Sequence, residues 1–315
     1  MEKHFKIGTR ASPLALYQAE LVKSYLAAEL PMLTIEIVKI RTSGDMTRRS
    51  TPRPLETKRV FTKEIEDALL AGEVDMAVHS AKDLAVEMPQ GLTIGGVLAR
   101  EDARDCLIAR GNLTVKTLTL GARVGTASLR RKKQLLKMNP ELLIEEVHGN
   151  VETRLRKLEE GHFDALVLAY AGLKRLGLAG HASEIFNPTQ MYPAPGQGII
   201  VIQTRAQDPE TAAILGPIHH AVTGQVLACE RAFLRRLEGG CQLPCGIVSK
   251  VEGHEIRLAG ILLSLEDASF VEAEHQGSMN RAEQTGRELA EIILEKGGNK
   301  ILEQMKRQAR KPEHP

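Results

Sequence analysis

The pattern of apolar and polar positions predicts that the chain begins with a strand, a helix and a second strand. The first strand is expected over residues 6–9, and the helix opens at Ser12 and Pro13, because Ser is a favoured N-cap and Pro suits the first turn. A β-branched run over residues 34–40 predicts the second strand. The expected apolar face of the helix consists of Leu14, Tyr17, Leu21 and Tyr25. Strands that alternate with helices are typical of a sheet whose faces are covered by helices.

A helix followed by a glycine and an apolar strand occurs twice along the chain. The first occurrence predicts a helix over residues 62–71 and a strand over 74–79. The second predicts a helix over residues 151–160 and a strand over 164–169. The repetition indicates two related α/β lobes.

Further apolar segments are expected to connect these lobes. Strands are expected over residues 92–98 and 105–109, with residues 100–104 between them crossing into the second lobe, and a strand over 199–203 is expected to return to the first. Lobes joined in this way form a cleft that can hinge. Domain 1 is therefore expected to comprise residues 1–98 and 199–216, and domain 2 residues 103–193.

The pattern changes near residue 221 and predicts a third domain over residues 221–307. A helix is followed by strand-like segments of alternating polarity, and a last helix over residues 280–296 ends at Gly297. The first helix and the segments cover residues 221–238, 248–251, 255–263 and 270–275. This order predicts an α+β domain built on an antiparallel sheet.

Residues 42–60 lack periodicity and carry Gly44, Pro52, Pro54 and five basic side chains. Structureless segments of this length in compact domains are usually functional lids or disordered. We favour a mobile, basic lid, with plain disorder as the alternative.

Composition excludes several classes of function. The 315 residues include 42 basic and 40 acidic side chains, so the net charge of +2 gives no global field that attracts nucleic acid. Aromatic residues make up 3% with no Trp, which leaves little surface for stacking bases. No apolar run approaches the roughly 20 residues that cross a bilayer, and the first strand begins by Phe5, too early for a signal peptide. We therefore expect a cytoplasmic protein without nucleic-acid or membrane partners.

The run from Gly125 to Lys133 combines small residues, an N-cap Ser and clustered basic side chains at a predicted helix start. Backbone N–H groups at a helix start bind anions, and Arg130 with Arg131 can hold a carboxylate through paired bonds. The alternative is a solvated basic helix end. Other junctions of strand and helix carry Arg10, Arg154 and Arg175. Because α/β ligand sites gather at such junctions, we expect a ligand with several carboxylates or phosphates.

Two further positions offer chemistry. Lys82 and Asp83 end a buried-type strand, and in a cleft of arginines Asp83 would stay ionised and stabilise a positive centre or manage a proton. Taken alone, a Lys-Asp pair is usually a pair of solvated surface side chains without a catalytic role. Cys241 follows two glycines on a turn, where a thiolate near arginines is a better nucleophile. Zinc binding with Cys245 is a competing idea with weak ligand spacing, and an inert buried cysteine is the other alternative.

Eight ordered segments resemble the porphobilinogen deaminase family across nearly the whole chain. They are TRASPLAL (9–16), AVHSAKD (77–83), REDARD (100–105), VGTASLRR (124–131), GNVETR (149–154), AGLKRLGL (171–178), GQG (196–198) and EGGCQ (238–242). Eight matches in order are far more specific than any one of them. The resemblance implies two lobes built like type-II periplasmic binding proteins, a third domain and a monomer.

The resemblance also implies a transferase of tetrapyrrole (porphyrin and haem) biosynthesis. Four porphobilinogen molecules are condensed head to tail, ammonia is released, and hydrolysis frees linear hydroxymethylbilane. The chain grows on a dipyrromethane cofactor tethered by a thioether to Cys241, no metal is implied, and Asp83 corresponds to the catalytic aspartate. The implied cofactor- and substrate-binding residues are Arg10, Ser12, Lys82, Thr126, Ser128, Arg130, Arg131, His148, Asn150, Arg154, Arg175 and Gln197. The implied lid residues are Lys58, Arg59 and Phe61.

The chain departs from the family pattern at several positions. His148 stands where the family usually has Arg, which removes a permanent charge and a two-pronged geometry. We expect weaker binding there and activity favoured at lower pH. Residues 56–60 replace a glycine-rich sequence, and Cys245 replaces an aliphatic residue, which raises a second attachment point or an oxidised pair. Two alternatives stay open: a non-catalytic carboxylate-binding protein of the type-II binding fold, and a deaminase that has lost turnover.

Overall fold

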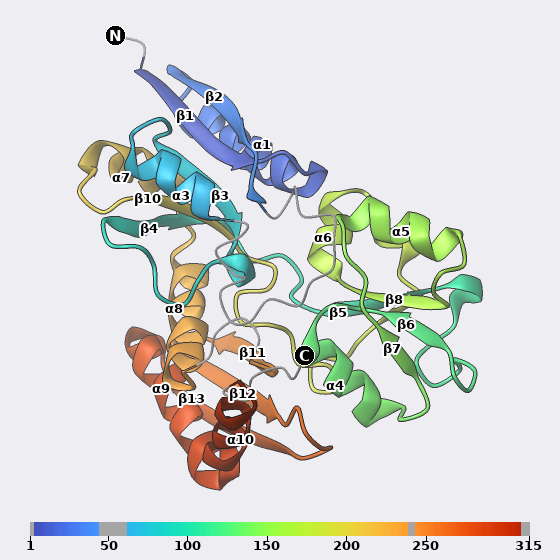
Figure 1. Ribbon diagram of the computed structural model, residues 1–315. Coiled ribbons are helices and arrows are strands. Elements are labelled where there is room, and N and C mark those ends of the chain that lie inside the picture. The colour runs from blue at the N-terminus through green and yellow to red at the C-terminus, as the bar shows by residue number, and fades with distance from the viewer. Residues whose placement is uncertain (1–2, 44–61, 239–242, 310–315) are drawn as a thin grey trace. The chain divides into compact units, whose positions relative to one another are not determined.

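The computed structural model of the protein describes three stretches of the chain, residues 3–43, 62–238 and 243–309. They form two five-stranded sheets and one three-stranded sheet (Figure 1). The chain divides into two compact units, Met1–Glu101 with Gly196–Leu227 and Asp102–Pro195 with Ala228–Pro315. One five-stranded sheet belongs to the first unit, and the other two sheets belong to the second.

The sheet of the first unit, here called lobe one, has the strand order β2-β1-β3-β10-β4. Its strands are β1 (Lys3–Arg10), β2 (Leu33–Ile40), β3 (Met76–Ser80), β4 (Leu92–Val97) and β10 (Ile200–Arg205). β1 is parallel to β2 and β3, whereas β10 is antiparallel to both β3 and β4. The predicted return of the strand at residues 199–203 to the first lobe is therefore confirmed.

Helices pack against both faces of this sheet. The helices of lobe one are α1 (Pro13–Glu29), α3 (Lys63–Leu70) and α7 (Pro209–Leu215). On one face Val22 and Leu26 of α1 pack in a cluster with Ile7 of β1. On the other face Ile65 of α3 packs in a cluster with Ala77 of β3. Alternation along each strand supplies the two apolar faces that these helices need.

Helix α1 begins as predicted but buries a partly different face. Ser12 is the N-cap, and its side chain accepts a hydrogen bond from the amide of Ala15. The predicted apolar face is only partly right, because Leu21 packs against the core whereas Tyr17 and Tyr25 are 42% and 48% exposed. The buried residues of the helix are Gln18, Ala19, Val22 and Leu26. Tyrosine has an apolar body and a polar tip, so it suits a helix surface and can be mistaken for a core position.

The sheet of lobe two repeats the spatial order and strand directions of lobe one, but its antiparallel strand β5 comes first in the chain, whereas the corresponding β10 comes last. Its order is β7-β6-β8-β5-β9, with β6 parallel to β7 and β8 and with β5 antiparallel to β8 and β9. Its strands are β5 (Asp105–Ala109), β6 (Arg123–Gly125), β7 (Leu143–Glu145), β8 (Ala165–Ala169) and β9 (Glu184–Ile185). Its helices are α4 (Leu129–Met138), α5 (Val151–Glu159) and α6 (Tyr170–Arg175). The prediction of two related α/β lobes is confirmed.

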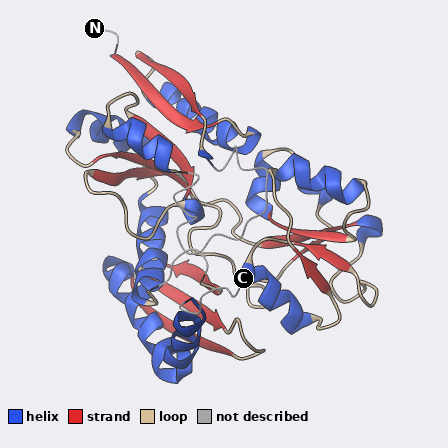
Figure 2. Ribbon diagram, in the orientation of Figure 1, coloured by secondary structure: helices blue, strands red, loops and turns tan. Residues whose placement is uncertain are grey.

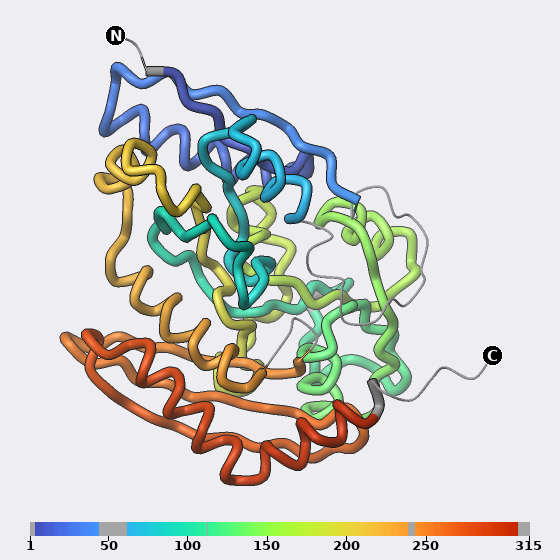
Figure 3. Tube along the Cα trace, turned by 60° about the vertical axis from the view of Figure 1, so that its left-hand side comes forward, coloured from blue at the N-terminus to red at the C-terminus, as the bar shows by residue number. Residues whose placement is uncertain are grey.

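The third domain is the predicted α+β unit on an antiparallel sheet. The strands are β11 (Cys245–Glu252), β12 (Glu255–Leu263) and β13 (Phe270–Ser278), in that spatial order. The helices are α9 (Ala282–Ile293), α10 (Asn299–Ala309) and, from Ala228 onward, α8 (Ala221–Arg236), whose first turns belong to the first unit (Figures 2 and 3). Helix α9 packs on β12 and β13. A methyl group on Gly286 of α9 would lie 2.0 Å from the carbonyl oxygen of Cys229 in α8, so these helices approach closely.

The predicted helix end at Gly297 is only partly right. Helix α9 ends at Ile293, and a π turn over Leu294–Gly298 leads directly into α10. Gly297 takes a φ of 117° in this turn, a conformation that glycine adopts without a Cβ penalty. The helical α10 was missed because the two glycines suggested a stop. Single 3₁₀ turns complete the fold at Ala81–Asp83 (η2), Arg110–Asn112, Ala179–His181, Gly216–Ile218 and Met279–Arg281.

A helix that spans a membrane must be both long and apolar. Within residues 3–43, 62–238 and 243–309, no single helix is long and apolar enough to cross a bilayer, and one bent pair, Pro209–Ile218 with Ala221–Arg236, meets the criterion only when combined.

Candidate active site

Lobe one gathers several predicted site residues at one edge of its sheet. β1 and β3 are parallel, so their carboxyl ends lie at the same edge. Arg10 is the last residue of β1, and Ser12 caps the helix that follows. β3 ends at Ser80 and continues into η2, which carries Lys82 and Asp83. The Asp83 side chain is exposed, so its carboxylate is available to a ligand.

The segment that enters β10 supports this short turn. Lys82 Nζ donates to Gln197 Oε1 at 3.2 Å, and the carbonyl of Gln197 accepts from Arg100 Nε at 2.9 Å. A methyl group on Gly196 would lie 3.0 Å from the Cβ of Ala81 and 3.2 Å from the amide nitrogen of Lys82. Gln197 was among the predicted residues, whereas the supporting contact of Arg100 was not foreseen. The turn that bears Asp83 is therefore held by main-chain packing as well as by side chains.

A buried polar group lies beneath the end of β3. His79 is 6% exposed and Gln203 on β10 is fully buried, and Gln203 Nε2 donates to Glu66 Oε1 at 3.2 Å. Within the described part of the chain, Nε2 of His79 has no hydrogen-bond partner. Burial, with the positive charge of Arg10 as a smaller cause, lowers the pKa of His79 from 6.5 to about 4. His79 is therefore neutral at physiological pH.

Lobe two places its predicted residues at the corresponding edge. β6, β7 and β8 are parallel, and α4, α5 and α6 each follow one of them. Ser128 is the N-cap of α4 and accepts from the amide of Arg131 at 3.4 Å. Asn150 is the N-cap of α5 and accepts from the amide of Thr153 at 2.9 Å. Thr126 is buried, and its hydroxyl accepts from the amide of Ser128 at 3.3 Å. Both helix starts were predicted.

Arg130 and Arg131 are bound to a buried carboxylate that sequence analysis did not single out. Asp105, the first residue of β5, is fully buried. Its Oδ2 lies 2.7 Å from Arg130 Nη1, and its Oδ1 accepts from Arg131 Nη2 at 2.7 Å and Nε at 3.1 Å. Arg130 Nη1 also donates to the carbonyl of Tyr192, and Arg131 Nη1 to that of Val167 at 3.0 Å. The two arginines are 5% and 6% exposed, so the alternative interpretation, a solvated basic helix end, is wrong for them.

Arg130, Arg131 and Asp105 together carry a net positive charge. Burial lowers the pKa of Arg130, and Asp105 opposes that shift. Two guanidinium groups around one carboxylate leave a surplus of one positive charge. Among the described residues, hydrogen bonds to Arg130 use Nη1, and none uses Nε or Nη2. A second carboxylate would therefore find both charge and donors here.

The other predicted residues of lobe two lie nearer to solvent. His148 is exposed, and its Nε2 lies 3.1 Å from Glu146 Oε2. Arg154 is half-buried on α5, and its Nε donates to the carbonyl of Gly149 at 2.8 Å. Arg175 is half-buried at the end of α6. The neighbour of His148 is thus a carboxylate of the same turn, which an imidazolium would bind.

Four predicted residues lie outside the described residues: Lys58, Arg59, Phe61 and Cys241. The cysteines that the structure describes, Cys106, Cys229 and Cys245, are buried, and none of the three is in a disulfide bond. Burial raises the pKa of Cys106 and of Cys229 to about 12, so both thiols stay protonated. In the described ranges no group of three or more His, Cys, Asp or Glu side chains is arranged to hold a metal ion.

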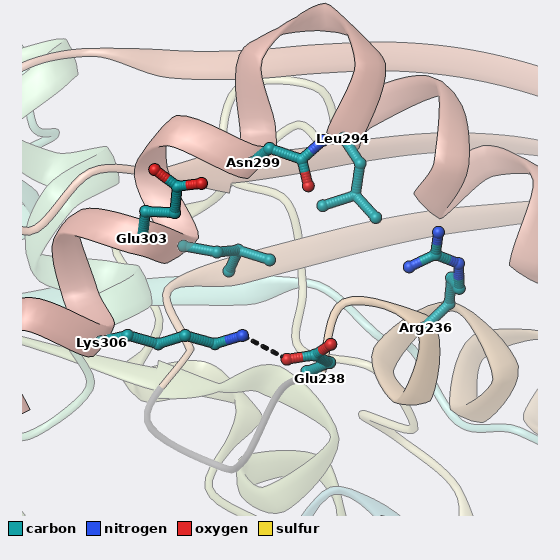
Figure 4. Close-up of a pocket in the computed structure, with 7 residues that line it drawn as sticks. Arg236, Glu238, Leu294, Asn299, Glu303 and Lys306 are labelled. Atoms are coloured by element: carbon teal, nitrogen blue, oxygen red, sulfur yellow. Dashed lines mark hydrogen bonds and ion pairs between the residues drawn. The ribbon is translucent and has the colours of Figure 1, made fainter.

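A pocket in the third domain is lined by none of the predicted site residues that the structure describes. It is lined by Arg236 and Glu238 at the end of α8, by Leu294, and by side chains of α10 that include Lys306. Figure 4 shows Lys306 and Glu238 pointing toward each other, with an ion pair between them. Both side chains are more than half exposed, so this pair adds little stability.

Comparison with known proteins gives a consistent set of relatives. A family model described as porphobilinogen deaminase, dipyromethane cofactor binding domain matches residues 5–213, and one for the porphobilinogen deaminase C-terminal domain matches residues 225–295. A protein named porphobilinogen deaminase from Pelobacter propionicus is 42% identical over 303 residues, 96% of this chain and 97% of the relative. One of the same name from Trichlorobacter lovleyi is 44% identical over 301 residues, 96% of each chain.

Solved structures overlap with this chain at low sequence identity. The methionine binding protein MetQ has a TM-score of 0.45 and 14% identity, covering 71% of this chain and 90% of its own. The periplasmic VFT2 domain of Bordetella pertussis BvgS has a TM-score of 0.43 and 16% identity, covering 73% of this chain and 93% of its own.

Replacing Asp105 by Asn should strongly destabilise the protein, because it leaves two buried guanidinium groups without a counter-charge. We expect the free energy of unfolding to fall by about 3–5 kcal/mol, measured by urea denaturation. The matched control is Asp164→Asn, because the Asp164 side chain is 37% exposed and its Oδ1 lies 3.6 Å from Arg110 Nη2. That change should lower stability by about 1 kcal/mol or less. Equal losses for the two variants would contradict a special role of Asp105.

The buried His79 should make stability depend on pH. Its folded pKa of about 4 lies below the ordinary value of 6.5, so between these values the unfolded chain binds a proton that the folded chain does not. This contribution to stability is complete above pH 6.5 and is lost as the pH falls toward 4, by roughly 3 kcal/mol in total. His79→Gln should flatten the profile in this window relative to His162→Gln at an exposed histidine. A parallel decline in both variants would exclude His79 as the cause.

Proposed function

Because the chain belongs to the porphobilinogen deaminase family, we propose that it is a transferase that condenses four porphobilinogen molecules head to tail. Four ammonia molecules leave, and hydrolysis frees linear hydroxymethylbilane for tetrapyrrole biosynthesis. A dipyrromethane cofactor held through Cys241 supplies the free α-carbon on which the chain grows. The observation that carries the proposal is the positive surplus at the start of α4, where Arg130 and Arg131 share one carboxylate.

The residues of lobe two fit a ligand that bears carboxylates. Each pyrrole unit of porphobilinogen carries one acetate and one propionate arm, so every added ring brings two negative charges. The surplus charge beside Asp105 lies at the N-terminus of α4, whose dipole also favours anions. Arg154 and Arg175 extend the set of cationic groups in this lobe. We assign Thr126, Ser128 and Asn150 to shaping the two helix starts.

In lobe one we assign Asp83 to the reacting ring. Its exposed carboxylate would stabilise the positive charge that develops on a pyrrole nitrogen during condensation. Lys82 and Arg10 would bind acid arms, with Gln197 fixing the direction of the Lys82 amine. Ser12 would act through the start of α1, which it caps.

The buried cysteines support Cys241 as the point of attachment. A thioether forms only with a sulfur that can reach the ligand as a thiolate. Cys106 and Cys229 are fully buried, and Cys245 is 2% exposed at the start of β11. Burial of Cys245 makes a second attachment point there unfavourable. We further propose that residues 42–60, with Lys58, Arg59 and Phe61, form a lid, and that the enzyme is a cytoplasmic monomer.

The mass of the denatured protein tests this proposal directly. We expect the intact chain to exceed its sequence mass by two pyrrole units and Cys241→Ser to have the sequence mass alone. Cys245→Ser is the matched control and should keep the added mass. An unmodified wild-type mass in protein that turns over porphobilinogen, or loss of the added mass only in Cys245→Ser, would rule out attachment at Cys241. Absence of both turnover and added mass would favour a carboxylate-binding protein.

His148→Arg should strengthen binding at the start of α5. An imidazole loses its proton as the pH rises, whereas a guanidinium stays charged and binds a carboxylate through two bonds. We expect a lower KM for porphobilinogen and a smaller decline of kcat/KM toward alkaline pH. His162→Arg, at an exposed histidine after α5, controls for the added surface charge. If KM and the pH profile match the parent enzyme, His148 does not contact the acid arms.

A further inference from the structure

Gln134 on α4 binds the main chain of a residue far along the sequence. Its Oε1 accepts from the amide of Tyr192 at 2.7 Å, and its Nε2 donates to the carbonyl of Tyr192 at 3.1 Å. The same carbonyl accepts from Arg130 Nη1. Gln134 is 1% exposed, so these bonds are made away from water, where an unmade bond is costly. The main chain of Tyr192 is thereby attached to the helix that bears Arg130.

The side chain of Tyr192 belongs to a different part of the molecule. It is buried in a cluster with Ile261 and Leu263 of β12 in the third domain. The next residue, Pro193, accepts a hydrogen bond from the amide of Ile247 in β11 at 2.9 Å. The segment at Tyr192 and Pro193 therefore contacts α4 through the main chain of Tyr192. It contacts the third domain's sheet through the Tyr192 side chain and the Pro193 carbonyl.

The close approach of β11 to this segment depends on a glycine. A methyl group on Gly246 would lie 2.5 Å from Cβ of Tyr192 and 2.7 Å from its carbonyl oxygen. Distances below 3.0 Å require the backbone to shift, because carbonyl oxygens cannot move like the end of a flexible side chain. The contact between β11 and Tyr192 is thus closely packed.

The outer face of α4 adds three weaker contacts to the third domain. Lys137 Nζ lies 2.7 Å from Glu272 Oε1 and 3.6 Å from the ring centre of Phe270. Lys133 Nζ donates to the carbonyl of Asp267 at 3.1 Å. These side chains are partly solvated, so the buried contacts of Gln134 and Tyr192 dominate the attachment.

We propose that Gln134 is a positioning residue that fixes α4 to β11 through Tyr192, so that the paired arginines and the third domain's sheet move as one body. β11 begins at Cys245, four residues after Cys241. If the function proposed above holds, the distance between the start of β11 and the paired arginines then stays constant while the tetrapyrrole chain grows. The coupling itself can be measured without substrate.

The first test is Gln134→Leu in the full-length protein, with amide hydrogen exchange resolved at single residues. If Gln134 acts only within α4, the Gln134→Leu substitution should raise amide exchange only in α4 and around Tyr192. The proposed coupling predicts that exchange of the Ile247 amide, in the other domain, rises about tenfold or more. Unchanged protection of Ile247 in folded Gln134→Leu protein overturns the proposal.

The reciprocal test starts from the third domain. Gly246→Ala pushes β11 away from Tyr192 and should raise exchange in α4, at residues 130–138, by a similar factor. Gly260→Ala is the matched control, because its methyl group would meet Leu289, Ile293 and Phe233 at 3.0–3.2 Å within the third domain itself. We expect no effect of that variant on α4. Equal effects of both glycine variants would mean general destabilisation and would overturn the proposal, whatever the mass of the Cys241 variants shows.

Discussion

The ion group of Asp105 with Arg130 and Arg131 is the interaction on which lobe two depends. A buried charge is tolerated only when it is paired and hydrogen-bonded, and here one carboxylate accepts three bonds from two guanidinium groups. The carbonyls of Tyr192 and Val167 satisfy further donors. This group ties the start of α4 to β5, to β8 and to the segment at Tyr192, between β9 and β10. The geometry of the edge that we propose to bind anions therefore follows from a structural ion pair.

The same feature explains how the site can be both rigid and attractive to acids. Removing the carboxylate would expose a larger positive charge but would also free two long side chains to move. With the carboxylate present, the arginines lose little further entropy when a ligand binds, which is the advantage of a preorganised site. The buried Gln197 acts similarly in lobe one, where it accepts a hydrogen bond from Lys82 in the turn that ends in Asp83.

Local signals in the sequence predicted much of the fold and the positions of many site residues. The caps at Ser12 and Ser128 were recognisable because an N-cap depends on neighbours three residues away, whereas the cap at Asn150 was not foreseen. Strand bounds such as 105–109 followed from short apolar runs with clear limits. The partnership of Asp105 with two arginines 25 and 26 residues later had no local signal, because tertiary packing decides it. Gln134 was missed for the same reason, since a buried glutamine in a basic helix has the pattern of a surface residue.

The errors also have physical causes. The face of α1 was partly misplaced because Tyr17 and Tyr25 share the spacing of a core stripe while their hydroxyl groups stay in water. Helix α10 was missed because the left-handed conformation of Gly297 produces a kink between two helical segments, and a glycine pair in the sequence reads as a helix end. Family resemblance carried the assignment of Cys241 and Asp83, which periodicity and charge alone left open between chemistry and ordinary surface.

The strand order of lobe one affects the order in which the two lobes can fold during synthesis. β4 pairs only with β10 among the described strands, and β10 is made after the whole of lobe two. A nascent chain that has left the ribosome as far as β4 therefore lacks the strand that joins β4 to β3. Lobe two is continuous between β5 and β9 and needs no later segment to close its sheet. The second lobe in the sequence is thus the first that can complete its sheet during synthesis, and the amino-terminal lobe must wait for it.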